Sequence, residues 1–151
     1  MRTVQNMLDL KDTQVNIISP EIMVIDALKK LISVNLSYLV VYENDKYSGI
    51  FCERDYTRKL VMEGRSSRDT KVKDVMTIDL PVVSRNSTVE DCMYQMNTRG
   101  SRYVAAFDGE QFLGIITIND LLREVLANKQ DVFDDTLTSN LLDTDEGGKI
   151  F

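Results

Sequence analysis

Gly114-Ile-Ile-Thr-Ile-Asn-Asp120 has a counterpart earlier in the chain, Gly49-Ile-Phe-Cys-Glu-Arg-Asp55, with glycine, isoleucine and aspartate at the same spacing. The two segments lie 65 positions apart, and the same shift aligns further identical residues. These pairs are Ser19/Ser84, Val24/Val89, Asp26/Asp91, Tyr38/Tyr103 and Arg58/Arg123. Such a constant register predicts that the chain contains two copies of one structural unit.

Each copy has the same predicted order of elements, namely strand, helix, strand, strand and helix. The expected strands are 15–19, 38–43 and 46–52 in the first copy and 80–84, 103–107 and 111–117 in the second. Asn44-Asp45 and Asp108-Gly109 are the predicted hairpin turns. The apolar helix faces, read from helical spacing, include Ile32, Val61, Met93 and Leu122. We therefore expect an α+β fold of two β-α-β-β-α repeats.

The two repeats are expected to pack with pseudo-twofold symmetry, because a three-stranded sheet with helices on one side leaves its other face bare. Residues 1–64 form the first repeat with its N-terminal lead-in, 65–76 a linker, 77–128 the second repeat and 129–151 an acidic tail. The tail either forms a docking helix through Val132, Leu137 and Leu141 or is frayed.

Composition excludes several functional classes. The net charge of −6 and pI near 4.7 argue against a protein that neutralises many phosphates along DNA or RNA. The absence of histidine removes histidine-dependent nucleophilic catalysis and histidine-ligated metal sites. The two cysteines suit a reducing cytoplasm, and the apolar runs are too short for a membrane helix or a secretory signal. We therefore expect a cytoplasmic protein with no metal, no nucleic-acid partner and no membrane segment.

The doubled signature GIITIND and GIFCERD, with KVKDVMT before the second copy, resembles the cystathionine-β-synthase (CBS) domain. The resemblance covers about residues 4–128. It implies a regulatory sensor that binds an adenine-containing ligand, such as AMP, ATP, NAD or S-adenosylmethionine, in a cleft between the repeats. It also implies a homodimer that needs no cofactor and signals to a separate client protein.

The resemblance assigns site residues as well. Thr117 and Asp120 are implied to hold phosphate or ribose in the complete copy, with Cys52 and Asp55 in the incomplete one. The other implied ligand contacts are Thr77, Leu80 and Val82 at the adenine and Arg102 at the phosphate. Gly49 and Gly114 would let the backbone approach a ligand closely. Ala105 departs from the family pattern, in which many members have proline.

The Thr117–Asp120 pair has a second interpretation, because Thr-x-x-Asp is also a helix capping box that needs no ligand. Cys52 is a poor N-cap residue, yet Asp55 is kept, which suggests that capping alone does not explain the aspartate. A thiol is a weak hydrogen-bonding group, so the first site is predicted to bind phosphate less well than the second. Alternatively, Cys52 is a redox sensor whose pKa is lowered by the helix N-terminus.

Three functions remain open: a ligand sensor, a structural or dimerisation module with ligand-free clefts, and an enzyme. The enzyme has the least support, since no paired carboxylates or activated nucleophile are found in a chain without histidine. Tyr38 and Tyr103 are either core residues or purine-stacking residues. The basic residues between Arg58 and Lys73 form either a solvated face or a phosphate patch.

Overall fold

Two α+β units make up residues 2–11 and 16–127, the part of the chain that this computed structural model describes. One unit contains residues 16–79, and the other combines residues 2–11 with residues 80–127. Each unit has one three-stranded sheet, with strand order β1-β2-β3 in the first and β4-β5-β6 in the second. The predicted α+β class and the repeated element order are thereby confirmed, while the packing between the repeats stays a prediction.

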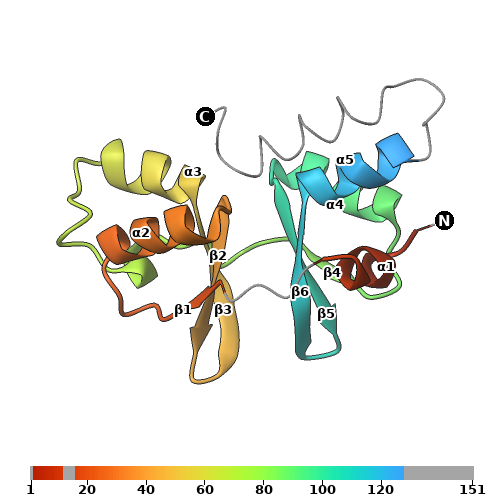
Figure 1. The fold of residues 1–151 in the computed structure, drawn as a ribbon, viewed down its shortest axis with the longest axis horizontal. Helices are drawn as coiled ribbons and strands as arrows, with labels where there is room; N and C mark the ends of the chain where they lie inside the picture. The colour runs from red at the N-terminus through yellow and green to blue at the C-terminus, as the bar shows by residue number, and fades with distance from the viewer. Residues whose placement is uncertain (1, 12–15, 128–151) are drawn as a thin grey trace. The chain divides into compact units, whose positions relative to one another are not determined.

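The unit of residues 16–79 is built on strands β1 (Ile17–Ile18), β2 (Tyr38–Glu43) and β3 (Lys46–Cys52). Helix α2 (Val24–Val34) and the short helix α3 (Glu53–Asp55) lie on one side of this sheet (Figure 1). A six-residue π-helix, Tyr56–Val61, continues α3, and a 3₁₀ turn, Val72–Asp74, closes the unit. Its core places Leu39, Val41 and Phe51 of the sheet against apolar residues of the helices and of the closing turn, namely Val24, Ala27, Leu31, Leu60, Val72 and Val75.

The second unit repeats this plan with strands β4 (Val82–Ser84), β5 (Tyr103–Asp108) and β6 (Gln111–Thr117) and helices α4 (Val89–Arg99) and α5 (Ile118–Ala127). Its core joins Val104, Ala106 and Ile116 of the sheet to apolar residues of the helices, namely Val89, Cys92, Met96 and Leu121. A further helix, α1 (Val4–Asp9), contributes Val4 and Met7 to the same core.

The hairpin registers of the two units match residue for residue. Tyr38 pairs with Cys52 in the first and Tyr103 with Thr117 in the second, and each ladder has one irregularity at the equivalent place. Asn44 and Asp45 form the first turn as predicted, both with positive φ. The second turn is one residue later than expected: Asp108 still pairs with Gln111, so Gly109 and Glu110 form the loop.

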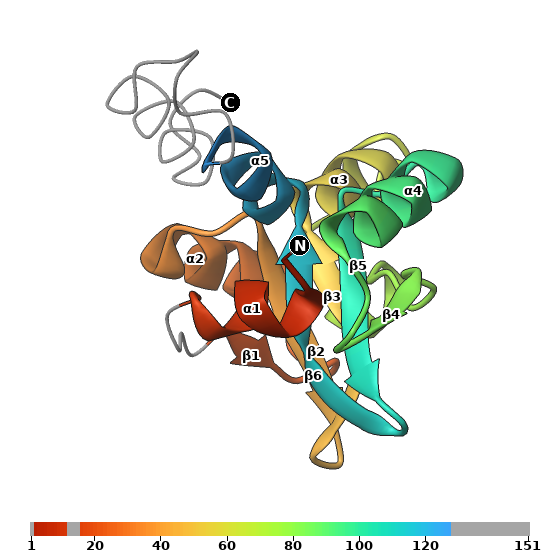
Figure 2. The same cartoon turned by 90° about the vertical axis from the view of Figure 1, so that its right-hand side faces the viewer.

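The N-terminal lead-in belongs to a different unit from the one we expected. Instead of joining the first repeat, α1 contacts β6 of the second, as Figure 2 shows. The Val4 amide donates to the Ser87 carbonyl at 2.8 Å, and the Gln5 amide donates to Arg85 at 3.0 Å. The equivalent segment before the second repeat instead joins the first unit, where the Val72 amide donates to Ile22 at 2.9 Å. Each lead-in segment packs on the unit where its valine, Val4 or Val72, becomes fully buried, because removing apolar surface from water stabilises that arrangement.

Four residues of the predicted apolar helix faces are exposed: Ile32, Val61, Met93 and Leu122. In the first repeat, the π-helix explains the change at Val61, since its wider turn alters which side chains face the core. Leu60 stays buried there, whereas Val61 and the next residue, Met62, are exposed. The predicted tail helix of residues 129–151 lies outside the described residues.

Candidate functional site

Asp120 is a buried carboxylate in the first turn of α5. Its Oδ2 accepts hydrogen bonds from the Thr117 amide at 2.8 Å and from Lys11 Nζ at 2.9 Å. In return, the Asp120 amide donates to Thr117 Oγ1 at 3.2 Å. The pair therefore forms a complete capping box, and Lys11 adds an ion pair to it.

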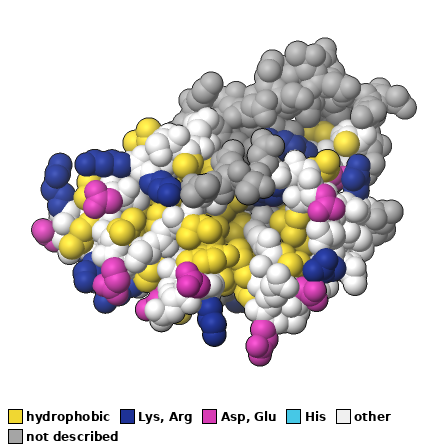
Figure 3. Space-filling view, turned by 60° about the horizontal axis from the view of Figure 1, so that its bottom comes forward, with side chains coloured by type: hydrophobic (Ala, Val, Ile, Leu, Met, Phe, Trp, Pro, Cys, Tyr) yellow, Lys and Arg dark blue, Asp and Glu magenta, His cyan; other side chains and the backbone are white. Residues whose placement is uncertain are grey.

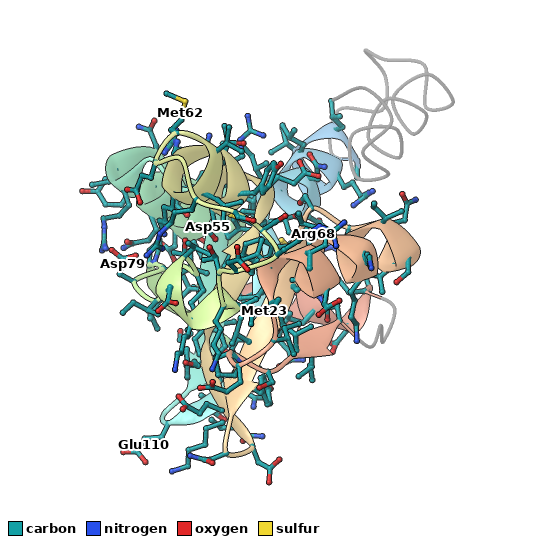
Figure 4. All side chains as sticks on the ribbon, turned by 90° about the vertical axis from the view of Figure 1, so that its left-hand side faces the viewer. Met23, Asp55, Met62, Arg68, Asp79 and Glu110 are labelled. Carbon is teal, nitrogen blue, oxygen red and sulfur yellow. The ribbon has the colours of Figure 1, made fainter. Side chains whose placement is uncertain are left out.

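Asp55, the equivalent residue of the first repeat, is buried more deeply and lies among interior side chains in Figure 4, whereas Met62 points away. Its Oδ2 accepts from the Cys52 amide at 3.0 Å and from Cys52 Sγ at 3.3 Å. Its Oδ1 accepts from Thr77 Oγ1 at 2.6 Å and from Lys59 Nζ at 2.9 Å. Capping does explain this aspartate, contrary to our expectation, because its bond to the residue-52 amide requires no hydroxyl at that position.

The two carboxylates differ in how much of their accepting capacity is used. Both oxygens of Asp55 accept two donors each. Among the described residues, both donors to Asp120 are on Oδ2, and Arg123 Nη1 lies 3.9 Å from Oδ1, beyond hydrogen-bond distance. Oδ1 of Asp120 therefore has accepting capacity that the described residues do not use.

Three backbone amides at the start of α5 already have acceptors. The Thr117 amide donates to Asp120, the Ile118 amide donates to the Arg102 carbonyl at 2.9 Å, and the Asp120 amide donates to Thr117 Oγ1. A phosphate could bind these amides only by displacing their acceptors. These three amides are therefore not available to an anion as long as their present hydrogen bonds are kept.

The two signature glycines make room for protein atoms. A Cβ on Gly49 would lie 2.3 Å from the Thr77 carbonyl oxygen, and one on Gly114 would lie 2.9 Å from Leu8 Cδ2. Thr77 pairs with Ile50 through both its amide, at 2.8 Å, and its carbonyl, at 2.9 Å. The close approach that we expected for a ligand is thus made by Thr77 at Gly49 and by Leu8 at Gly114.

The structure divides the predicted ligand contacts into two sets. Cys52, Asp55 and Thr77 come together in the unit of residues 16–79. Thr117, Asp120 and the Arg102 backbone come together in the other unit, which also contains half-buried Leu80 and exposed Val82. Tyr38 and Tyr103 are buried, which favours the core interpretation of both.

The thiol of Cys52 is not activated. Burial, reinforced by the neighbouring Asp55 carboxylate, raises the pKa of Cys52 to about 12. The helix N-terminus was expected to lower this pKa, but desolvation of the thiolate outweighs it. Cys52 is therefore protonated at neutral pH and donates to Asp55, which argues against the redox-sensor alternative.

Two lysines at these sites were not predicted from the sequence. Lys59 lies four residues after Asp55, and this helical spacing could have indicated the ion pair. Lys11 lies 109 positions from Asp120, so no local pattern links the two residues. Within the described ranges, no group of three or more His, Cys, Asp or Glu residues could hold a metal ion.

The basic residues of the linker are largely engaged by local acceptors. Lys71 and Lys73 both pair with Glu21, at 2.9 and 3.2 Å, and Arg65 donates to the Asp74 carbonyl at 3.4 Å. Hydrogen bonds from the two lysines lower the pKa of Glu21. Acidic and basic side chains are interspersed on the face shown in Figure 3, which favours a solvated surface over a phosphate patch.

Comparison with known proteins supports one family. The family model for the CBS domain matches the chain twice, at residues 9–62 and 72–127. The mitochondrial CBS domain-containing protein CBSX3 of Arabidopsis thaliana is 35% identical over 108 residues, 68% of this chain and 52% of that protein. The arabinose 5-phosphate isomerase KdsD of Yersinia pestis is 30% identical over 112 residues, 74% of this chain but 34% of the enzyme. The chain therefore spans about half the length of the first relative and about a third of the second.

A solved structure shows the same fold along most of the chain. It is a protein with CBS domains from Burkholderia ambifaria MC40-6, provisionally assigned to signal transduction. It matches with a TM-score of 0.79 at 32% identity, over 89% of this chain and 99% of that one. None of the helices in the described part of this chain is long and apolar enough to span a membrane. From the double match to the family model and these relatives, the chain belongs to the CBS domain family and carries two CBS repeats.

Proposed function

We propose that this CBS-domain protein is a regulatory module that binds an adenine-containing ligand, chiefly at Asp120, and signals to a separate partner protein. The observation that supports this most directly is the state of Asp120. It is a buried carboxylate whose Oδ1 has no donor within hydrogen-bond distance among the described residues. A ribose hydroxyl could therefore donate to it in a charge-assisted hydrogen bond, of a kind worth about 1.5–3 kcal/mol.

Asp55 is a weaker candidate for the same role. A ribose hydroxyl would have to displace Thr77, Lys59 or Cys52, because each Asp55 oxygen already accepts two donors. Thr77 in particular donates over only 2.6 Å and is fixed by its backbone pairing with Ile50. The two sites are therefore proposed to be unequal, with occupancy greater at Asp120.

Isothermal titration of the full chain with AMP, ADP, ATP, NAD and S-adenosylmethionine tests this proposal. Asp120→Asn keeps the size of the side chain but removes its charge, so the affinity of the bound ligand should fall about tenfold or more, which corresponds to about 1.4 kcal/mol. The matched variant Asp55→Asn should lower it by less than about threefold. Equal losses for the two variants would reject the inequality, and the absence of binding by every compound would reject the sensor itself.

A structural module with ligand-free clefts is the second candidate function. It is favoured by the full set of protein donors on Asp55, which accounts for that carboxylate without a ligand. A stable dimer in sedimentation, unchanged in melting temperature by any of these compounds, would support the structural role. A ligand that raises the melting temperature would favour the sensor.

The regulatory role and the partner are argued from the relatives. The region that matches KdsD accounts for 34% of that isomerase, so related repeats occur as a minor part of a larger enzyme. By analogy, we propose that the repeats of this chain regulate an activity rather than perform one. The separate client protein, the homodimer and the cytoplasmic location stay predictions.

A further inference from the structure

We infer that Lys11 makes the Asp120 site selective for adenine ligands that carry a phosphate, over adenosine and over the cationic S-adenosylmethionine. The inference rests on the proposed function and names the ligand class for that site. The contacts of the two aspartates, compared between the units, provide the argument.

Equivalent pairs of acceptors in the two units accept hydrogen bonds from different donors. In the first unit, the Ile50 carbonyl and the Asp55 carboxylate accept from the amide and the hydroxyl of one residue, Thr77. In the second unit, the equivalent acceptors are the Ile115 carbonyl and the Asp120 carboxylate. Both accept from the ammonium of Lys11, at 3.0 and 2.9 Å. In the second unit, a charged side chain therefore donates the two hydrogen bonds that a neutral residue donates in the first unit.

The two donors differ in how they can move. Thr77 reaches its acceptors through its backbone amide and its short side chain, and moving it would break its bridge to Ile50. Lys11 reaches its acceptors through the end of a long side chain, which remains 28% exposed. Rotation about its side-chain bonds could carry the ammonium from Asp120 to a nearby anion without disturbing the backbone.

Charge favours a phosphate as that anion. A ligand whose hydroxyl donates to Asp120 Oδ1 would lie next to the Lys11 ammonium, with Arg123 Nη1 3.9 Å from the same oxygen. The Thr117, Ile118 and Asp120 amides at the start of α5 already have acceptors, so nearby side-chain cations are the groups that can compensate a ligand's charge without breaking these bonds. A phosphate would gain the ammonium contact, adenosine would not, and the sulfonium of S-adenosylmethionine would be repelled.

Calorimetric titration of the full chain with AMP, ATP, adenosine and S-adenosylmethionine tests the inference. The wild type should bind AMP or ATP at least about tenfold more tightly than adenosine. Lys11→Met should reduce this ratio to about threefold or less, chiefly by weakening the nucleotides, and Lys11→Arg should largely preserve it. Lys73→Met is the matched control, because it removes one positive charge from the other unit and should leave the ratio unchanged. Lys11→Gln provides a second neutral variant if Lys11→Met does not fold.

The outcomes separate this inference from the proposed function. If adenine ligands bind and Asp120→Asn weakens them, but the neutral Lys11 variants keep the nucleotide-to-adenosine ratio, only the role of Lys11 is wrong. If the Lys11 variants weaken all four compounds equally, Lys11 merely supports the fold and the inference is likewise overturned. If the wild type binds none of the compounds, the proposed function fails, and the inference with it.

Discussion

Asp55 and Asp120 occupy equivalent positions in the two repeats, yet only Asp120 has an oxygen with no donor within hydrogen-bond distance among the described residues. The difference does not come mainly from the Cys52/Thr117 exchange that distinguishes the signatures, because both aspartates still accept the amide of that residue. It comes from Thr77 and Lys11, which lie far from their aspartates in the sequence, and from Lys59, four residues after Asp55. Thr77 and Lys59 fill Oδ1 of Asp55, whereas Lys11 joins Oδ2 of Asp120. Repeats with nearly the same signature can therefore differ in how many donors their aspartates accept, through their lead-in segments and through a neighbouring helix residue.

The largest expected effect is on stability. It should be greater for substitution of Asp55, whereas the effect on ligand binding should be greater for substitution of Asp120. Asp55→Ala removes a buried acceptor and leaves the Cys52 amide and the Thr77 hydroxyl without it, so we expect a loss of about 3 kcal/mol in the free energy of unfolding. Asp120→Ala should cost about 1.5 kcal/mol, since fewer donors lose their partner. Urea denaturation followed by circular dichroism measures both losses. A larger loss for Asp120→Ala would contradict the comparison of the two carboxylates.

Much of the fold followed from the repeat itself. The constant shift of 65 positions and the period of the apolar residues predicted both sheets and the turn at Asn44-Asp45. The π-helix at Tyr56–Val61 was not predicted, because its residues also suit an α-helix and the difference arises from tertiary packing. The unit that receives α1 was also missed, since a lead-in can pack on either repeat without any change in its own periodicity.

The sequence predicted the site only in part. It identified Asp55 and Asp120, but it could not tell how many donors each carboxylate accepts. Lys11 and Thr77 reach their aspartates across 109 and 22 positions, and no local spacing predicts such contacts. The argument that capping could not explain Asp55 was wrong because it considered the N-cap side chain and overlooked the N-cap amide.

A smaller expected effect is the loss of stability at alkaline pH. It arises because the first repeat has the buried thiol of Cys52 at the position where the second repeat has Thr117. The pKa of Cys52 is raised from 9.0 to about 12, so above pH 9 the unfolded chain loses this proton before the folded chain does. The stability it contributes is therefore fully present below pH 9 and is lost as pH rises towards 12. At pH 10 this loss is about 1.4 kcal/mol.

Cys52→Thr should remove that part of the pH dependence between pH 8 and 10, measured by urea denaturation at each pH. Cys92, whose pKa is raised to about 11 by burial, remains as an internal reference in the variant. Tyr47, whose pKa burial raises from 10.0 to about 12, also lowers the stability as pH approaches 10, but it does so equally in the wild type and the variant and cancels in the comparison. An unchanged pH profile in Cys52→Thr would show that the thiol is not desolvated as described.

The smallest expected effects separate two explanations of the weaker first site. If the Cys52 thiol limits ligand binding at Asp55, Cys52→Thr should restore that binding. If the protein donors to Asp55 limit it, Thr77→Val should restore it. Thr77→Val removes the 2.6 Å donor from Asp55 and should cost about 1 kcal/mol of stability.

Titration with AMP in an Asp120→Asn background reports on the first site. There we expect Thr77→Val to raise affinity a few-fold, about 0.5–1 kcal/mol, and Cys52→Thr to leave it unchanged while adding about 0.5 kcal/mol of capping stability. The opposite result would assign the inequality to the signature residue, because the donors from distant segments would then not limit access to Asp55.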